Sequence, residues 1–260
     1  TMISSPQNPK IKNVVRLLEK ASERRDQNLT VAEGEREIGL AVRAGWMVQT
    51  LFVCSEVNSR PPAFGLPPDT VLEVSRAVFD KIAYRENRDG LVALVTPRKL
   101  SLADIRLTAS PLVIVLESVE KPGNLGAVLR TADAARVDAV LVCDPQTDLY
   151  NPNVVRSSVG CLFTTQTAVC TTDAALRWLR QKGIRTYAAA LTARRFYHET
   201  DLSGPAALVM GTEATGLSDH WLRATDEQIK IPMRGEIDSL NVSTSTAVLV
   251  FEAMRQRGFV

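Results

Sequence analysis

Short apolar runs alternate with longer amphipathic stretches along the second half of the chain. The apolar runs predict buried strands at 112–116, 139–143, 186–190, 206–210 and 228–231. Apolar residues at helical spacing predict helices at 123–135, 153–158, 171–182 and 240–256. Because the strands are apolar throughout instead of alternating with polar residues, they indicate a parallel sheet covered by helices on both faces.

The first half of the chain shows the same alternation on a smaller scale. Its pattern predicts helices at 33–44 and 75–83 and strands at 49–54, 71–74 and 91–95. The stretch 96–110 interrupts the alternation and has Pro97 and Pro111 near its ends. We therefore expect two α/β domains, formed by residues 1–106 and 107–260.

A basic stripe marks the N-terminal segment. Basic residues recur at spacing four, namely Lys12, Arg16, Lys20 and Arg24. Apolar residues on another face recur at helical spacing, namely Ile11, Val14, Val15 and Leu18. This pattern predicts an amphipathic helix. Its basic face has two interpretations, an RNA-binding surface or a solvated face whose charges pair with Glu19 and Glu23.

The composition is that of an ordinary globular protein. The chain has 260 residues, of which 45% are hydrophobic and 23% charged, and its net charge is +2. A charge so close to zero does not by itself indicate a nucleic-acid-binding protein, so any basic surface must be local.

Metal binding and membrane insertion are not expected. The four cysteines include no C-x-x-C pair, and there are only two histidines. The N-terminus is polar, and no apolar run reaches the roughly 18 residues that a membrane span needs. We expect a cytoplasmic protein with no metal site.

The first of three candidate ligand loops follows the strand at 112–116. Ligands of open parallel sheets bind at the carboxyl ends of the strands, where such loops lie. In this loop Asn124 and Arg130 are six residues apart, on a similar side of the predicted helix. The guanidinium of Arg130 could hold a phosphate or a ribose oxygen. The alternative is that Asn124 caps the helix and Arg130 forms a surface ion pair.

The second loop, 211–216, follows the strand at 206–210. Gly211 and Gly216 allow the backbone to approach a ligand closely. The loop is not a P-loop, because Leu217 and Ser218 stand where Gly-Lys-Ser/Thr would be needed, and the sequence contains no G-x-G-x-x-G. Glu213 favours a cationic or hydroxyl-bearing ligand over a phosphate. The alternative is a glycine turn with a capping glutamate.

The third loop follows the strand that ends at Ile231. It leads through Ser239 to Asn241 at the start of the predicted C-terminal helix. Polar residues that compete with helical backbone bonds continue into that helix, over 243–246. Their density favours a helix start that faces a polar ligand, although Ser239 could also be a plain N-cap.

Together these loops resemble the three motifs of the SpoU/TrmH family of SPOUT-class RNA ribose methyltransferases, in order and in spacing. The matching residues are Asn124 and Arg130, then Gly211, Glu213 and Gly216, then Ile231–Met233 and Ser239–Val242, with Asn151–Gly160 also similar. The resemblance runs from Pro111 to the end of the chain. Residues 5–9 and 31–35 are similar, more loosely, to the L30e-like substrate-binding domain of rRNA-modifying members.

Three departures from the family pattern leave the proposed catalytic residues intact. Lys121 stands before Pro122 where an acidic residue is common. Arg136 takes the place of a frequent glycine, and Thr212 that of a frequent asparagine. They put helix ends and substrate preference in question, but not activity.

The resemblance implies the fold, cofactor and partners. It implies a deep trefoil knot in the C-terminal parallel-sheet domain, S-adenosylmethionine as the methyl donor and a homodimer formed through that domain. It implies RNA as the substrate, with 23S rRNA favoured over tRNA because of the N-terminal domain. Two alternatives remain, a tRNA 2′-O-methyltransferase and a catalytically silent RNA-binding or ribosome-assembly protein.

The resemblance also implies residue roles. Arg130 would activate or orient the ribose 2′-hydroxyl, positioned by Asn124, Glu213, Ser239 and Asn241. The cofactor would be held by Leu191, Gly211, Thr212, Glu213, Gly216, Ile231, Met233 and Leu240. RNA binding is expected at Lys10, Lys12, Arg16, Arg24, Arg85, Arg88 and Arg156.

Overall fold

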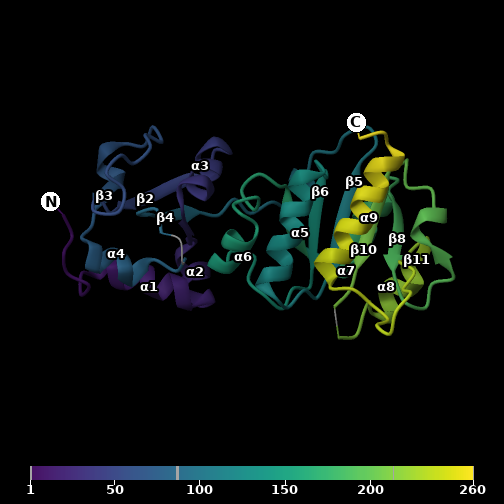
Figure 1. The fold of residues 1–260 in the computed structure, drawn as a ribbon. Helices are drawn as coiled ribbons and strands as arrows, with labels where there is room; N and C mark the ends of the chain where they lie inside the picture. Colours follow the sequence, from purple (N-terminus) through teal and green to yellow (C-terminus); the bar gives the residue numbers. More distant parts are fainter. Residues whose placement is uncertain (1, 86–87, 213, 260) are drawn as a thin grey trace. The chain divides into compact units, whose positions relative to one another are not determined.

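The computed structural model of the chain describes residues 2–85, 88–212 and 214–259. Its contacts divide the chain into two compact units (Figure 1). The first unit comprises residues 1–98 and 148–164, and the second comprises 99–147 and 165–260. The predicted boundary between residues 106 and 107 stays a prediction. It assigns 148–164 to the second domain, whereas in the structure this segment packs with the first unit. No helix in the described residues is long and apolar enough to cross a membrane.

In the part of the first unit that the structure describes, four strands form one sheet with the order β1-β4-β2-β3. Its strands are β1 (Thr30–Glu33), β2 (Met47–Val53), β3 (Val71–Glu73) and β4 (Leu91–Thr96). Its helices are α1 (Pro9–Glu19), α2 (Ala21–Gln27), α3 (Glu35–Arg43), α4 (Arg76–Ile82), α6 (Pro152–Ser157) and the short 3-10 helix η1 (Pro68–Thr70). β4 is antiparallel to both β1 and β2, whereas β2 and β3 are parallel.

Two predicted helices of this unit are present, but their bounds differ from the prediction. The predicted single basic helix is interrupted at Lys20, whose backbone is extended at φ −116° and ψ 118°, so the stripe divides between α1 and α2. The helix predicted from residue 33 begins only at Glu35, after Gly34 at φ +111°. The residues before it form β1, which pairs with β4. Glu33, the predicted first residue of the helix, instead ends this strand and pairs with Val92 of β4.

The segment 148–164 is held to the first unit by polar contacts as well as by packing. Thr30 Oγ1 donates to the carbonyl of Tyr150 at 2.7 Å, and Trp46 Nε1 donates to the carbonyl of Phe163 at 3.0 Å. The ring of Trp46 also meets that of Phe163 edge-on, with centroids 5.0 Å apart.

Seven strands form one parallel sheet in the described part of the second unit, in the order β7-β6-β5-β10-β8-β11-β9. The strands are β5 (Leu112–Glu117), β6 (Ala139–Cys143), β7 (Thr167–Cys170), β8 (Arg185–Ala189), β9 (Arg195–Phe196), β10 (Ala206–Met210) and β11 (Glu227–Lys230). Sequence reading found neither β7 nor β9, because both are short and neither is an uninterrupted apolar run.

Helices cover both faces of this sheet, as the apolar strands predict. They are α5 (Pro122–Ala134), α7 (Thr172–Gln181), α8 (Asp219–Ala224) and α9 (Val242–Gln256), with the 3-10 helices η2 (Leu102–Asp104) and η3 (Tyr197–Glu199). α5 and α9 lie beside each other on one face (Figure 1). Val113 and Val115 of β5 point to the other face, where they pack in one core with Trp178 of α7 and Trp221 of α8. The predicted α/β fold is confirmed.

Candidate active site

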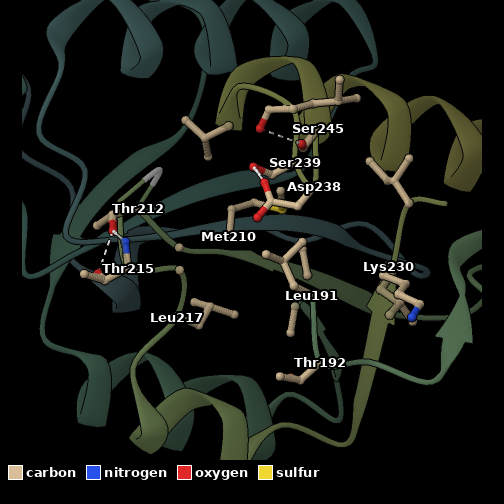
Figure 2. Close-up of a pocket in the computed structure, with 18 of the residues that line it drawn as sticks. Leu191, Thr192, Met210, Thr212, Thr215, Leu217, Lys230, Asp238, Ser239 and Ser245 are labelled. Carbon is tan, nitrogen blue, oxygen red and sulfur yellow. Dashed lines mark hydrogen bonds between the residues drawn. The ribbon is translucent and has the colours of Figure 1, made fainter. Parts of the chain in front are cut away.

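A cavity of about 570 Å³ opens at the carboxyl ends of β8, β10 and β11 (Figure 2). Strand ends and the loops that follow them form its walls. The lining residues that follow these strands include Ala190–Thr192, Gly211–Thr212, Ala214–Leu217, Ile231 and Met233. Asp238–Val242 line it at the start of α9, Ser245 and Leu249 line it from α9 itself, and Leu222 lines it from α8. The cavity therefore lies where the parallel-sheet rule places a ligand.

The second loop is folded tightly around its two glycines. The backbone N–H of Thr212 donates to the carbonyl of Gly216 at 3.1 Å, and Gly216 donates back to Thr212 at 3.1 Å. Gly216 has φ +69°, a conformation that favours glycine. A Cβ at Gly211 would lie 2.2 Å from the carbonyl carbon of Gly216. Only glycine at position 211 allows the loop to close in this way.

A hydrogen bond joins the first loop to the third. Asn241 is the N-cap of α9, and its Oδ1 accepts from the backbone N–H of Ser243 at 2.9 Å. Its Nδ2 donates to Oδ1 of Asn124, in the first turn of α5, at 3.2 Å. One side chain thus fixes the start of α9 and ties it to the helix that carries Arg130.

A smaller cavity of about 80 Å³ lies between the first and second loops. Its lining includes Glu117, Lys121 and Asn124, and it shares Gly211, Thr212, Ala214 and Val242 with the larger cavity. The buried carboxylate of Glu117 accepts from the backbone N–H of Ser218 at 2.8 Å, which anchors the end of the second loop to β5. The two cavities therefore share one wall. A ligand bound in one cavity would lie next to a ligand bound in the other, at the second loop.

The structure brings most of the predicted cofactor and catalytic residues together. The larger cavity is lined by Leu191, Gly211, Thr212, Gly216, Ile231, Met233, Ser239, Leu240 and Asn241. Asn124 lines the smaller one. Glu213 lies outside the described residues. Arg130 is exposed near the middle of α5 and lines neither cavity. The roles of all these residues remain predictions.

The predicted RNA-binding residues divide into exposed and internally paired groups. Lys10, Lys12 and Arg16 of α1 and Arg156 of α6 are exposed. Arg24 is not part of that surface, because its side chain is only 4% exposed. Its Nε donates to Asp148 at 2.7 Å and its guanidinium also donates to the carbonyl of Leu17 at 2.6 Å. We therefore remove Arg24 from the RNA-binding set.

Two further arginines of that set are engaged in ion pairs. Arg85 is half-buried and pairs with Glu37 at 2.8 Å, while also donating to the carbonyl of Glu33. Arg88 pairs with Asp80 on the surface. Phosphate binding by either arginine would have to compete with these carboxylates.

The sequence did not single out two residues that line the cavities, Asp238 and Glu117. Asp238 lines the larger cavity immediately before Ser239. Ser245, one of the polar residues over 243–246 that the sequence did single out, lines the same cavity. Glu117 has no motif to mark it, because its role depends on Ser218, 101 residues away along the chain. Among the residues that the structure describes, no group of three or more His, Cys, Asp or Glu side chains is placed to hold a metal ion.

Comparisons with known proteins match both units. A family model described as the SpoU rRNA Methylase family matches residues 111–251, and one described as an MRM3-like substrate binding domain matches residues 8–93. The 23S rRNA (guanosine-2′-O-)-methyltransferase RlmB of Vibrio vulnificus is 37% identical over 191 residues, which cover 71% of this chain and 77% of that protein. The 23S rRNA (guanosine(2553)-2′-O)-methyltransferase RlmP of Bacillus subtilis is 28% identical over 253 residues, or 96% of this chain and 97% of that protein.

A solved structure agrees over nearly the whole chain. The crystal structure of an rRNA methyltransferase from Sinorhizobium meliloti with AdoMet bound superposes with a TM-score of 0.89. It is 31% identical in sequence, and the match covers 98% of this chain and 97% of that one.

Proposed function

Because the chain belongs to the SpoU rRNA methylase family, we propose that it transfers the methyl group of S-adenosylmethionine to a ribose 2′-hydroxyl of 23S rRNA. The resemblance of its three loops to that family is confirmed by the match over residues 111–251. The observation that carries the proposal is the cavity that these loops form at the carboxyl ends of the strands. The relatives named for 23S rRNA and the match to a substrate-binding domain favour rRNA as the substrate.

The residues of the larger cavity fit S-adenosylmethionine. A volume of about 570 Å³ is in the range of small-molecule sites. Apolar side chains of Leu191, Leu217 and Met233 offer a surface for an adenine ring, while the backbone of the second loop offers polar groups. The cofactor supplies an electrophilic methyl group when bound, so the protein has to orient the acceptor and exclude water.

The acceptor ribose belongs, in this proposal, beside Asn124 and Arg130. Asn124 lines the small cavity that shares a wall with the cofactor cavity. Arg130 is exposed, and no hydrogen bond or ion pair links its side chain to another described residue. Its guanidinium is therefore available to hold an RNA phosphate or the ribose oxygen in line with the methyl group. Asn241 would keep Asn124 in place through their 3.2 Å hydrogen bond.

Three further features extend the proposal. The family resemblance supports a homodimer through the C-terminal domain and a trefoil knot in its chain path. A ribosomal RNA substrate supports action in the cytoplasm. The exposed basic residues of α1 and Arg156 support RNA binding by the first unit.

The test is Arg130→Ala, measured by transfer of a tritiated methyl group to 23S rRNA that lacks its natural 2′-O-methyl groups. We expect turnover to fall by about 100-fold, the usual cost of losing one preorganised charged donor, with little change in cofactor binding. Arg177→Ala is the matched control, because Arg177 is an exposed arginine of α7 that lines neither cavity. Near wild-type turnover in the Arg130 variant would refute the assigned role.

A further inference from the structure

Charged side chains are scarce in the lining of the larger cavity. Among the described lining residues, only Lys230 and Asp238 carry a charge. The ammonium of Lys230 lies 5.6 Å from the centre of the Phe196 ring, which is not part of the lining. Figure 2 shows Asp238 among the residues that line this cavity, together with the apolar side chains of Met210, Leu191 and Leu217. Asp238 is therefore the one negatively charged residue in the described lining.

The carboxylate of Asp238 is oriented but not neutralised. Its Oδ1 accepts from Oγ of Ser239 at 2.9 Å, which leaves the second oxygen available to a ligand. No lysine or arginine in the described residues forms an ion pair with Asp238. Asp238 itself is exposed, whereas the lining residues Leu191, Met210 and Leu217 are apolar. A bound ligand would therefore displace part of the water around the carboxylate and strengthen its interaction with a cation.

The two forms of the cofactor differ by one positive charge. S-adenosylmethionine carries a sulfonium cation, whereas S-adenosylhomocysteine, the product after methyl transfer, has a neutral thioether at the same position. Their adenine, ribose, ammonium and carboxylate groups are identical. A carboxylate facing the sulfur would stabilise the donor and not the product.

We propose that Asp238 makes the cavity select the sulfonium form of the cofactor over its neutral thioether product. The inference rests on the proposed function and deepens it, because it names the residue that distinguishes substrate from product. Methyl transfer removes the sulfonium charge, so it also removes the attraction between the cofactor and the Asp238 carboxylate. This loss favours release of the product. Asp238 would determine specificity without contacting the acceptor hydroxyl.

The experiment compares Asp238→Asn with the wild-type full chain. Asparagine keeps the volume and the acceptor for Ser239 and removes only the charge. Calorimetric Kd values are measured for S-adenosylmethionine, S-adenosylhomocysteine and sinefungin, which carries an amine in place of the sulfonium. We expect the variant to bind the two cationic ligands about 3- to 5-fold more weakly, a loss typical of one partly solvated ion pair, and to bind the product as before.

Two variants serve as controls. Asp238→Glu keeps the charge and should keep most of the preference. Glu236→Gln removes an exposed carboxylate of the same loop that lines neither cavity, and it should leave all three Kd values unchanged. Added salt should reduce the wild-type preference more than that of Asp238→Asn.

Several outcomes would overturn the inference. Equally weaker binding of all three ligands to Asp238→Asn would mean that Asp238 binds the ammonium group that they share. Unchanged Kd values would mean that the carboxylate does not interact with the charge of the cofactor. A loss of preference in Glu213→Gln but not in Asp238→Asn would assign the effect to Glu213. Absence of S-adenosylmethionine binding by the wild-type protein would instead remove the proposed function, and this inference with it.

Discussion

Gly211 has no room for a side chain. A Cβ there would lie 2.2 Å from the carbonyl carbon of Gly216 and 2.4 Å from the backbone nitrogen of Leu217. Both are backbone atoms, so no side-chain rotation can relieve the clash. We expect Gly211→Ala to force the second loop open, weaken S-adenosylmethionine binding at least about tenfold and lower the free energy of unfolding by about 1–3 kcal/mol. Calorimetry and chemical denaturation measure the two effects.

Gly235 provides the matched control in the neighbouring loop. A Cβ at this position would meet no atom within 4 Å, and its φ is not in the left-handed region. Gly235→Ala should therefore leave cofactor affinity unchanged and unfolding free energy equal or slightly higher. Equal effects of the two alanine substitutions would show that the clash at Gly211 is not what constrains the loop.

At the level of elements, strand positions and loop identities could be predicted because each depends on neighbouring residues. The apolar runs at 112–116 and 206–210 lie within β5 and β10, and the glycines after β10 indicated a close turn. The interruption at Lys20 could not be predicted in this way, since no glycine or proline marks it. The contact of Asn124 with Asn241 was also beyond local patterns, because it joins residues 117 positions apart.

Helix α9 ends with an ion pair that makes folding dependent on pH. Arg255 donates two hydrogen bonds of 2.8 Å to the carboxylate of Glu252, which is only 10% exposed. These bonds lower the pKa of Glu252 from 4.5 to about 2. Because the folded state favours the ionised form, the stabilisation is complete above pH 4.5 and is lost as the pH falls towards 2.

We expect Glu252→Gln to lower the free energy of unfolding by about 1 kcal/mol at pH 7, a modest value because Arg255 is largely exposed. The difference from wild type should shrink between pH 4.5 and pH 2. Chemical denaturation across this range measures it. Asp219→Asn, which breaks the exposed pair with Arg223, should change little at any pH. A difference that stays constant as the pH falls would contradict the assignment to the ionised carboxylate.

For the whole molecule, the segment 148–164 limits how the two units can be separated in experiments. Its buried residues include Leu149, Val154, Val155, Leu162 and Phe163, and the segment packs with the first unit although residues of the second unit flank it in sequence. The spacing of apolar residues predicts a helix or strand, but not which distant part of the chain it packs against. The sequence therefore could not show that 148–164 packs with the first unit. Deleting residues 1–98 would expose these apolar side chains to solvent. A change in RNA binding by the truncated chain could therefore not be assigned to loss of the basic surface alone.

Single-surface variants in the full chain avoid this problem. Lys10, Lys12 and Arg16 are exposed on α1, so replacing all three with glutamine should leave the fold and cofactor binding intact. If each contacts a phosphate, the slope of log affinity for 23S rRNA against log salt should decrease by about 2. Arg24→Gln is the contrasting variant from the same predicted stripe. It removes the ion-pair partner of Asp148, so it should cost about 3 kcal/mol of stability. A triple variant with the wild-type salt slope would exclude α1 from the RNA-binding surface.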